Sequence, residues 1–278
     1  MPLKLLLFLS VKKLWKVLVW IIGICAFLYV GVCLFFYFDQ EHLIFPGRKI
    51  APDYRYDFKI PYKEYRIKTA FNDTIDGYLF KVQKSKGLIF YLHGNGDNVE
   101  SWKNAVVKYT ALGYDAFEMD YPGYGKSSGH IYSLPQLLNA VKSAYDTVRR
   151  MYPENRIVIM GYSVGTGPAT WLAAHNQPSI LLLLAPYYSL GDMALHRYPF
   201  LPVFILKYPI NTYQYIQQVK APVVIFHGDA DEIIYYGSSL KLKPHLKRGD
   251  TLITLKGQDH FKFDDNRVYM DDLSGILK

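Results

Sequence analysis

The stretch that decides the fold is Gly161-Tyr162-Ser163-Val164-Gly165, which fits the pattern Gly-x-Ser-x-Gly. The uncharged run Ile157-Val158-Ile159-Met160 before it predicts a buried strand, and residues 169–174 after it predict a helix. Glycine on both sides of the serine permits a sharp strand-to-helix turn, which exposes the Ser163 hydroxyl above the edge of a sheet. The Val164 amide, at a helix N-terminus, favours negative charge and is a candidate oxyanion donor. The alternative is an incidental serine in a glycine-rich turn.

Seven further segments predict the other strands of a sheet, at 62–69, 78–82, 88–92, 116–119, 180–184, 223–226 and 252–255. The central segments are apolar runs, which are typical of parallel strands buried on both faces. Residues 99–112 and 134–151 predict helices between them. This alternation predicts an α/β fold, a mainly parallel eight-stranded sheet with helices on both faces.

The first two strands differ from the others because apolar and charged side chains alternate along the first of them. Asp76-Gly77 breaks the pattern before the second strand resumes at Tyr78. We therefore expect these two strands to form an opening hairpin.

A serine nucleophile needs a histidine base, and the base needs a carboxylate that orients it. His260 follows the last predicted strand, and in an open α/β sheet that loop reaches the same edge as Ser163. Three carboxylates, Asp229, Asp231 and Glu232, follow the preceding strand. We take Asp231 as the acid and Asp229 as its competitor.

The loop His93-Gly94-Asn95-Gly96 follows the strand at 88–92 and reaches the same sheet edge. We expect this loop to supply the second oxyanion donor, and the alternative is a plain turn. His93 and His227 each precede a glycine at a strand end, so both are expected to be buried histidines that form turns.

These motifs, together with Asp120-Tyr121-Pro122-Gly123-Tyr124-Gly125 and Asp259-His260, resemble those of the α/β-hydrolase superfamily over about residues 40–265. The resemblance is to its serine aminopeptidase-like, monoacylglycerol-lipase-like and acyl-protein-thioesterase-like members. It implies a triad of Ser163, Asp231 and His260, because the family pattern His-Gly-x-x-Asp supports Asp231. It also implies that the second oxyanion donor is the Asn95 amide.

Residues 17–38 form an uncharged run of 22 residues, long enough to span a bilayer as a helix. A cleaved signal peptide would end in small residues, whereas this run ends in Leu34-Phe35-Phe36-Tyr37-Phe38. A buried core helix, the third option, is rarely apolar on all faces. We predict an uncleaved single-pass anchor. Four lysines precede the run without any acid, which predicts a cytoplasmic N-terminus and a catalytic domain across the membrane, periplasmic in a bacterium.

The predicted organisation has four parts: a cytoplasmic N-terminus at 1–16, a transmembrane anchor at 17–38, a linker of irregular structure at 39–61 and an α/β-hydrolase domain at 62–278. Within the domain, residues 186–218 are rich in Tyr, Phe and Pro. This segment either forms a small cap that shapes a substrate pocket or carries ordinary packing aromatics.

Composition narrows the function further. The net charge is +8 without a basic run in the folded domain, which does not indicate nucleic-acid binding. Both cysteines, Cys25 and Cys33, lie in the apolar run, so the folded domain is expected to have no disulfide. No cluster has the spacing of metal ligands. We expect no metal, no cofactor, a small-molecule or acyl-chain substrate, and a monomer.

The sequence thus predicts a serine hydrolase, an esterase or thioesterase rather than a peptidase, that acts on a lipid or other acyl substrate through an acyl-enzyme on Ser163. One alternative is an aminopeptidase-type amide hydrolase, which is disfavoured because Asp192 is the only acid in the cap segment. The other is a non-catalytic binding protein with the same fold.

Overall fold

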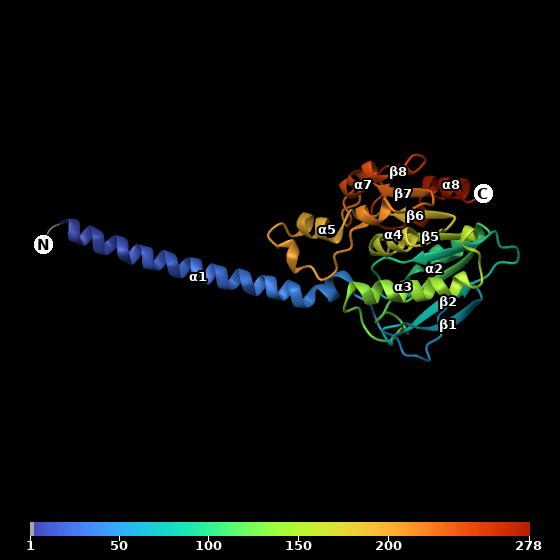
Figure 1. Cartoon of the computed structure of the whole chain (residues 1–278), viewed down its shortest axis with the longest axis horizontal. Coiled ribbons are helices and arrows are strands. Elements are labelled where there is room, and N and C mark those ends of the chain that lie inside the picture. The colour runs from blue at the N-terminus through green and yellow to red at the C-terminus, as the bar shows by residue number, and fades with distance from the viewer. Residues whose placement is uncertain (1–2) are drawn as a thin grey trace.

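An eight-stranded sheet forms the centre of the folded domain, in the order β1-β2-β4-β3-β5-β6-β7-β8. The computed structural model describes the chain from Leu3 to Lys278, with side chains from Lys13 onward (Figure 1). The strands are β1 (Tyr62–Lys68), β2 (Thr74–Phe80), β3 (Leu88–Leu92), β4 (Asp115–Met119), β5 (Ile157–Tyr162), β6 (Ile180–Leu184), β7 (Val223–Gly228) and β8 (Thr251–Leu255). β2 pairs antiparallel with β1 and β4, and the other pairs are parallel, which confirms the predicted fold class.

Helices cover both faces of this sheet. The α-helices of the described chain are α1 (Leu3–Ile44), α2 (Lys103–Ala111), α3 (Leu134–Arg149), α4 (Thr166–Ala174), α5 (Leu190–Arg197), α6 (Thr212–Ile216), α7 (Gly237–Leu242) and α8 (Arg267–Ile276). Leu88, Phe90 and Leu92 of β3 belong to the core that includes α3 and α4. Ile89 and Tyr91 belong to the core that includes α2 and α8. Because successive side chains of a strand point to opposite faces, burial on both faces requires a continuous apolar run.

The opening hairpin differs from the prediction in where it turns. β2 runs without interruption through Asp76 and Gly77, and the left-handed residue before it is Asn72, with φ of 64°. A Cβ on Gly77 would lie 2.3 Å from the ring of Phe117. The break predicted at Asp76-Gly77 is therefore wrong, because this glycine makes room for an aromatic side chain inside the sheet.

α1 is one continuous helix that projects from the folded domain (Figure 1). Its part from Lys13 to Ile44 is long and apolar enough to cross a membrane, and its most apolar window is not buried. Of the predicted cytoplasmic segment 1–16, residues 1–2 and all side chains through position 12 lie outside the described residues. The helix continues to Ile44, so the prediction of irregular structure is wrong for residues 39–44.

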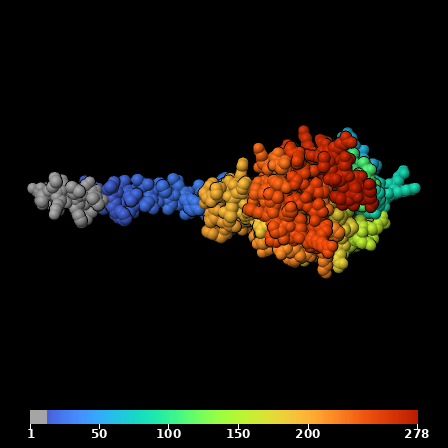
Figure 2. All heavy atoms as spheres, turned by 90° about the horizontal axis from the view of Figure 1, so that it is seen from above, coloured from blue at the N-terminus to red at the C-terminus, as the bar shows by residue number. Residues whose placement is uncertain are grey.

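Contacts with the cap explain why the helix continues. Residues 186–218 contain α5, a short 3-10 helix (Val203–Ile205) and α6. α5 and the 3-10 helix lie beside the C-terminal part of α1, at the junction between helix and domain (Figures 1 and 2). The side chains of Gln40 and Glu41 hydrogen-bond Lys207, and Glu41 also accepts from Tyr208. Tertiary contacts thus hold the last turns of α1 against the cap.

Candidate active site

The serine turn lies directly after β5. A 3-10 turn (Ser163–Gly165) leads into α4, and Ser163 has φ of 52°, in the left-handed region that side chains disfavour. A Cβ on Gly165 would lie 2.2 Å from the Leu92 carbonyl oxygen, and one on Gly161 would lie 2.6 Å from the Ala169 Cβ. Both glycines are therefore required by close packing, and the turn holds Ser163 at the carboxyl edge of the sheet.

The loops after β7 and β8 bring an acid and a base to this edge. His260 Nε2 lies 2.9 Å from Ser163 Oγ, and His260 Nδ1 lies 2.7 Å from Asp231 Oδ2. All three side chains are buried. The structure thus brings together the three residues that the sequence analysis selected. This geometry allows the imidazole to take a proton from the hydroxyl while the carboxylate orients it.

Fixed donors surround the Asp231 carboxylate. Its Oδ1 accepts hydrogen bonds of 2.9 Å from the amides of Ile233 and Ile234. His227 Nε2 donates to the Ile234 carbonyl at 2.8 Å and lies 3.4 Å from Asp231 Oδ2. Burial acts to raise the pKa of Asp231. The hydrogen bonds from His227 and His260 outweigh burial and hold this pKa well below the usual range. An ionised, immobile carboxylate is what the orienting role requires.

The competing acid, Asp229, is not hydrogen-bonded to His260. It is exposed, and its Oδ1 accepts a hydrogen bond of 2.6 Å from the Gly257 amide in the turn after β8. The imidazole of His260 therefore contacts Asp231, and Asp229 stabilises a turn.

A cavity of about 290 Å³ opens at Ser163. Asn95 and Val164, the two predicted oxyanion residues, line it beside Ser163 and His260. The other lining residues are all apolar or aromatic: Ile44, Tyr187, Leu190, Met193, Ile233, Ile234 and Phe261. Of the cap residues that line the cavity, Tyr187 is aromatic, whereas Leu190 and Met193 are aliphatic. The cavity wall is therefore less aromatic than the composition of residues 186–218 suggests.

His93 packs under the serine turn, as expected of a buried histidine that forms a turn. Its Nδ1 lies 2.8 Å from the Gly94 carbonyl oxygen, and its own carbonyl accepts a hydrogen bond of 3.0 Å from Tyr121. Burial lowers the pKa of His93 to about 4. The imidazole is therefore neutral at pH 7 and supports the loop that carries Asn95.

Three residues of the site were not predicted from the sequence. His227 is buried as expected, but it also contacts Asp231, and its spacing of four residues from that acid was the available signal. Tyr162 donates a hydrogen bond to the His260 carbonyl, and the two rings stack with centroids 5.3 Å apart. Ile44, at the end of α1, lines the serine cavity and had no sequence signal.

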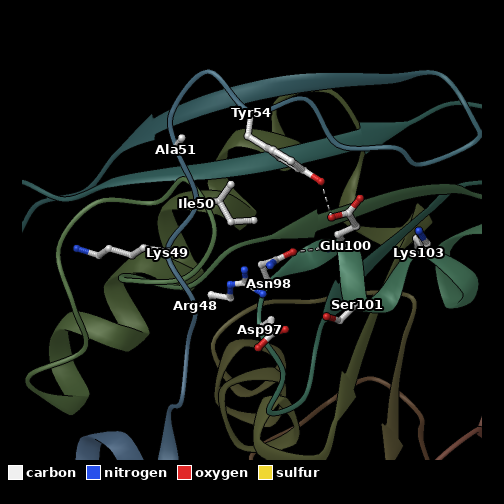
Figure 3. Close-up of a pocket in the computed structure, with 10 residues that line it drawn as sticks. All are labelled: Arg48, Lys49, Ile50, Ala51, Tyr54, Asp97, Asn98, Glu100, Ser101 and Lys103. Carbon is white, nitrogen blue, oxygen red and sulfur yellow. Dashed lines mark hydrogen bonds between the residues drawn. The ribbon is translucent and has the colours of Figure 1, made fainter.

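A larger polar cavity, of about 650 Å³, shares no lining residue with the serine cavity (Figure 3). In it Tyr54 donates a hydrogen bond of 3.1 Å to Glu100, near the mixed charges of Arg48, Asp97 and Lys103. None of the predicted site residues lines it. Among the described side chains, no three His, Cys, Asp or Glu residues are grouped as metal ligands.

Comparison with known proteins supports the fold. A family model described as serine aminopeptidase, S33, matches residues 83–215. The Pyrococcus furiosus esterase Pf2001 superimposes with a TM-score of 0.66 at 18% identity, over 83% of this chain and 94% of that one. Est1E from Butyrivibrio proteoclasticus, solved with ferulic acid bound, gives 0.60 at 18% identity, over 77% and 96%. These structures define the fold as that of an α/β-hydrolase.

Relatives by sequence agree with this class. Protein bem46 of Schizosaccharomyces pombe is 27% identical over 217 residues, 72% of each chain. An uncharacterised Mycobacterium tuberculosis protein is 25% identical over 267 residues, 92% of this chain and 94% of that one. Human alpha/beta hydrolase domain-containing protein 17B is 27% identical over 183 residues, 63% and 61% of the two chains. The chain is therefore similar in sequence to these proteins and shares the α/β-hydrolase fold.

Proposed function

We propose that this protein is a serine hydrolase that cleaves a carboxylic ester or thioester through an acyl-enzyme on Ser163. The observation that carries the proposal is the continuous hydrogen-bonded path from Ser163 Oγ through His260 to Asp231, with distances of 2.9 and 2.7 Å. A hydroxyl in such a path is activated because the base accepts its proton as it attacks.

Each residue has a role in the reaction. His260 Nε2 takes the Ser163 proton while Oγ attacks the carbonyl carbon, and the amides of Asn95 and Val164 donate hydrogen bonds to the oxyanion. His260 then gives the proton to the departing alcohol or thiol, which leaves an acyl group on Ser163. A water molecule, deprotonated by His260, releases the carboxylic acid and restores the serine.

The cavity favours an apolar acyl group over an N-terminal ammonium. Its cap-derived walls, Tyr187, Leu190 and Met193, carry no charge. Asp192, the one acid of the cap, is already occupied: it accepts hydrogen bonds of 2.5 Å from both Lys241 and Tyr235. An aminopeptidase would need a free carboxylate at this place, so the ester is the better substrate.

α1 is proposed to anchor the enzyme in a membrane. The span from Lys13 to Ile44 rises about 48 Å as a helix, more than the roughly 30 Å of a bilayer core. The lysines at its start favour a cytoplasmic N-terminus. The domain would then face the opposite side, the periplasm in a bacterium.

A fluorophosphonate probe tests the chemistry, because it labels only an activated serine. We expect the full-length protein in detergent to be labelled, and Ser163→Ala to abolish labelling and to lower ester turnover by about 10³-fold or more. A folded wild-type protein that is not labelled would be a binding protein rather than an enzyme.

The same preparation tests the substrate class. We expect p-nitrophenyl esters to be cleaved faster than aminoacyl amides, because the cap offers no free acid for an ammonium group. Faster turnover of the amides would overturn the ester assignment while leaving the serine mechanism intact.

A further inference from the structure

A second apolar cavity, of about 230 Å³, lies between the end of α1 and the cap. All of its lining side chains except Gln40, Arg197 and Tyr198 are apolar. The Gln40 amide is already satisfied, since Nε2 donates to the Ile205 carbonyl at 3.2 Å and Oε1 accepts from the Lys207 amide at 2.7 Å. We call this cavity the α1–cap groove. Its walls suit a hydrocarbon chain rather than a polar group.

The α1–cap groove adjoins the serine cavity. Ile44, Leu190 and Met193 line both. The last turn of α1 and the first turns of α5 therefore form a common wall, with the groove on one side and Ser163 on the other. A chain in the groove therefore has to pass between these side chains to place its carboxyl end at the nucleophile.

The cap also reaches the part of α1 that is predicted to lie in the bilayer. Tyr29 donates a hydrogen bond of 2.9 Å to the Phe200 carbonyl. Tyr29 precedes Phe38, the end of the predicted span, by nine residues, or about 14 Å along a helix. Phe200 thus lies at the depth of the outer acyl chains if the span is 17–38.

Exposed apolar side chains at the same place support this depth. Phe204 is 88% exposed, Phe200 52% and Val203 40%, although all three are large hydrophobic residues. Val203 lines the α1–cap groove, and the ring of Phe200 lies 6.3 Å from that of Phe36 in α1, between ring centroids. A patch of this kind, continuous with a membrane-spanning helix, is stabilised by contact with lipid.

We infer that the substrate is a long-chain ester dissolved in the bilayer, whose single acyl chain enters sideways through the α1–cap groove and passes Ile44 to reach Ser163. This inference rests on the proposed function. α1 is then a wall of the acyl-binding site as well as an anchor. A substrate taken from the membrane need not leave it before hydrolysis, which avoids the cost of exposing its chain to water.

Neighbouring residues of α5 allow a matched test. Ala194 lines the groove, whereas Leu195, the next residue of the same helix, does not line it and is 48% exposed. Full-length protein is placed in phosphatidylcholine vesicles and assayed with p-nitrophenyl palmitate in the bilayer and p-nitrophenyl acetate in solution. Ala194→Trp should lower the palmitate-to-acetate ratio of kcat/KM at least tenfold, and Leu195→Trp should change it less than twofold.

Fluorophosphonate labelling at the wild-type rate shows that each variant is folded. If Ala194→Trp is not labelled, the smaller Ala194→Leu replaces it, with at least a threefold fall in the ratio expected. Two results would overturn this inference but not the proposed function. One is the same palmitate-to-acetate ratio in the two tryptophan variants, and the other is a wild-type protein that cleaves p-nitrophenyl acetate but not p-nitrophenyl palmitate. A wild-type protein that is neither labelled nor active on acetate would overturn the proposed function with it.

Discussion

The serine turn and the cap both line one cavity but are held in different ways. The turn is fixed by backbone: Gly165 packs against the Leu92 carbonyl, and Ser163 keeps a left-handed φ between β5 and α4. The cap is held by side-chain contacts, with Gln40 and Glu41 of α1 on one side and with Tyr235 and Lys241 on the other. A wall made of sheet-edge backbone cannot shift without breaking the core. A wall held by a few polar contacts can differ in shape. In the proposed function, the chemistry then belongs to the turn and the choice of substrate to the cap.

The largest expected effect comes from the two carboxylates near the serine turn, Asp231 and Asp229. Asp231→Asn should lower kcat by about 10³-fold, because an amide cannot hold the His260 tautomer. Asp229→Asn should lower it no more than about threefold, since Asp229 contacts the Gly257 amide rather than the imidazole. Ester turnover of both variants measures this. Equal losses in two variants with wild-type melting temperatures would contradict the geometry.

A second prediction concerns stability under the serine turn. The pKa of His93 is lowered to about 4 in the folded state, against roughly 6.5 in an unfolded chain. Between these values the unfolded chain binds the extra proton, so the contribution of neutral His93 to stability is present above pH 6.5 and is lost as the pH falls to 4.

This loss amounts to about 3 kcal/mol, from the width of that pH window. Urea unfolding in detergent at pH 7 and pH 4 measures it, with His93→Gln as the comparison. The difference in the free energy of unfolding between wild type and variant should be smaller at pH 4 than at pH 7 by that amount. A constant difference would mean that the pKa of His93 is the same in the folded and the unfolded protein.

The smallest effect concerns the cap. Glu41→Gln removes the ion pair of 3.1 Å with Lys207, a loss of about 0.5–1 kcal/mol for a partly exposed pair. Amide hydrogen exchange in residues 190–206 should then quicken two- to fivefold, while Ser163 labelling stays at the wild-type rate.

Glu154→Gln is the control for the cap, because its ion pair with Arg149 has similar exposure and lies at the end of α3. Exchange in residues 190–206 should not change in this variant. If Glu41→Gln slowed Ser163 labelling by the same factor by which it quickened amide exchange in residues 190–206, the cap would hold the turn in place. The two walls would then not be independent.

Local patterns were sufficient for most of the sheet and for the position of Ser163. A continuous apolar run predicts a strand buried on both faces, and glycines around a serine predict a tight turn, because both depend on residues close together in the chain. The same reasoning failed at Gly77, where the glycine makes room for the ring of Phe117 from another strand. Nothing near Gly77 in the sequence marks that contact.

The 278 residues, read alone, therefore determined the strand order along the chain, the serine turn, the candidate base and a helix long enough for a membrane. Tertiary structure placed Asp231, the acid favoured by the family pattern, against His260, and it alone decided that His227 also contacts Asp231 and that Ile44 lines the cavity. The reason is physical: these outcomes depend on which loops meet at the sheet edge and on how α1 packs against the cap. Such contacts join residues far apart in sequence, and a local pattern of apolar and polar residues carries no information about them.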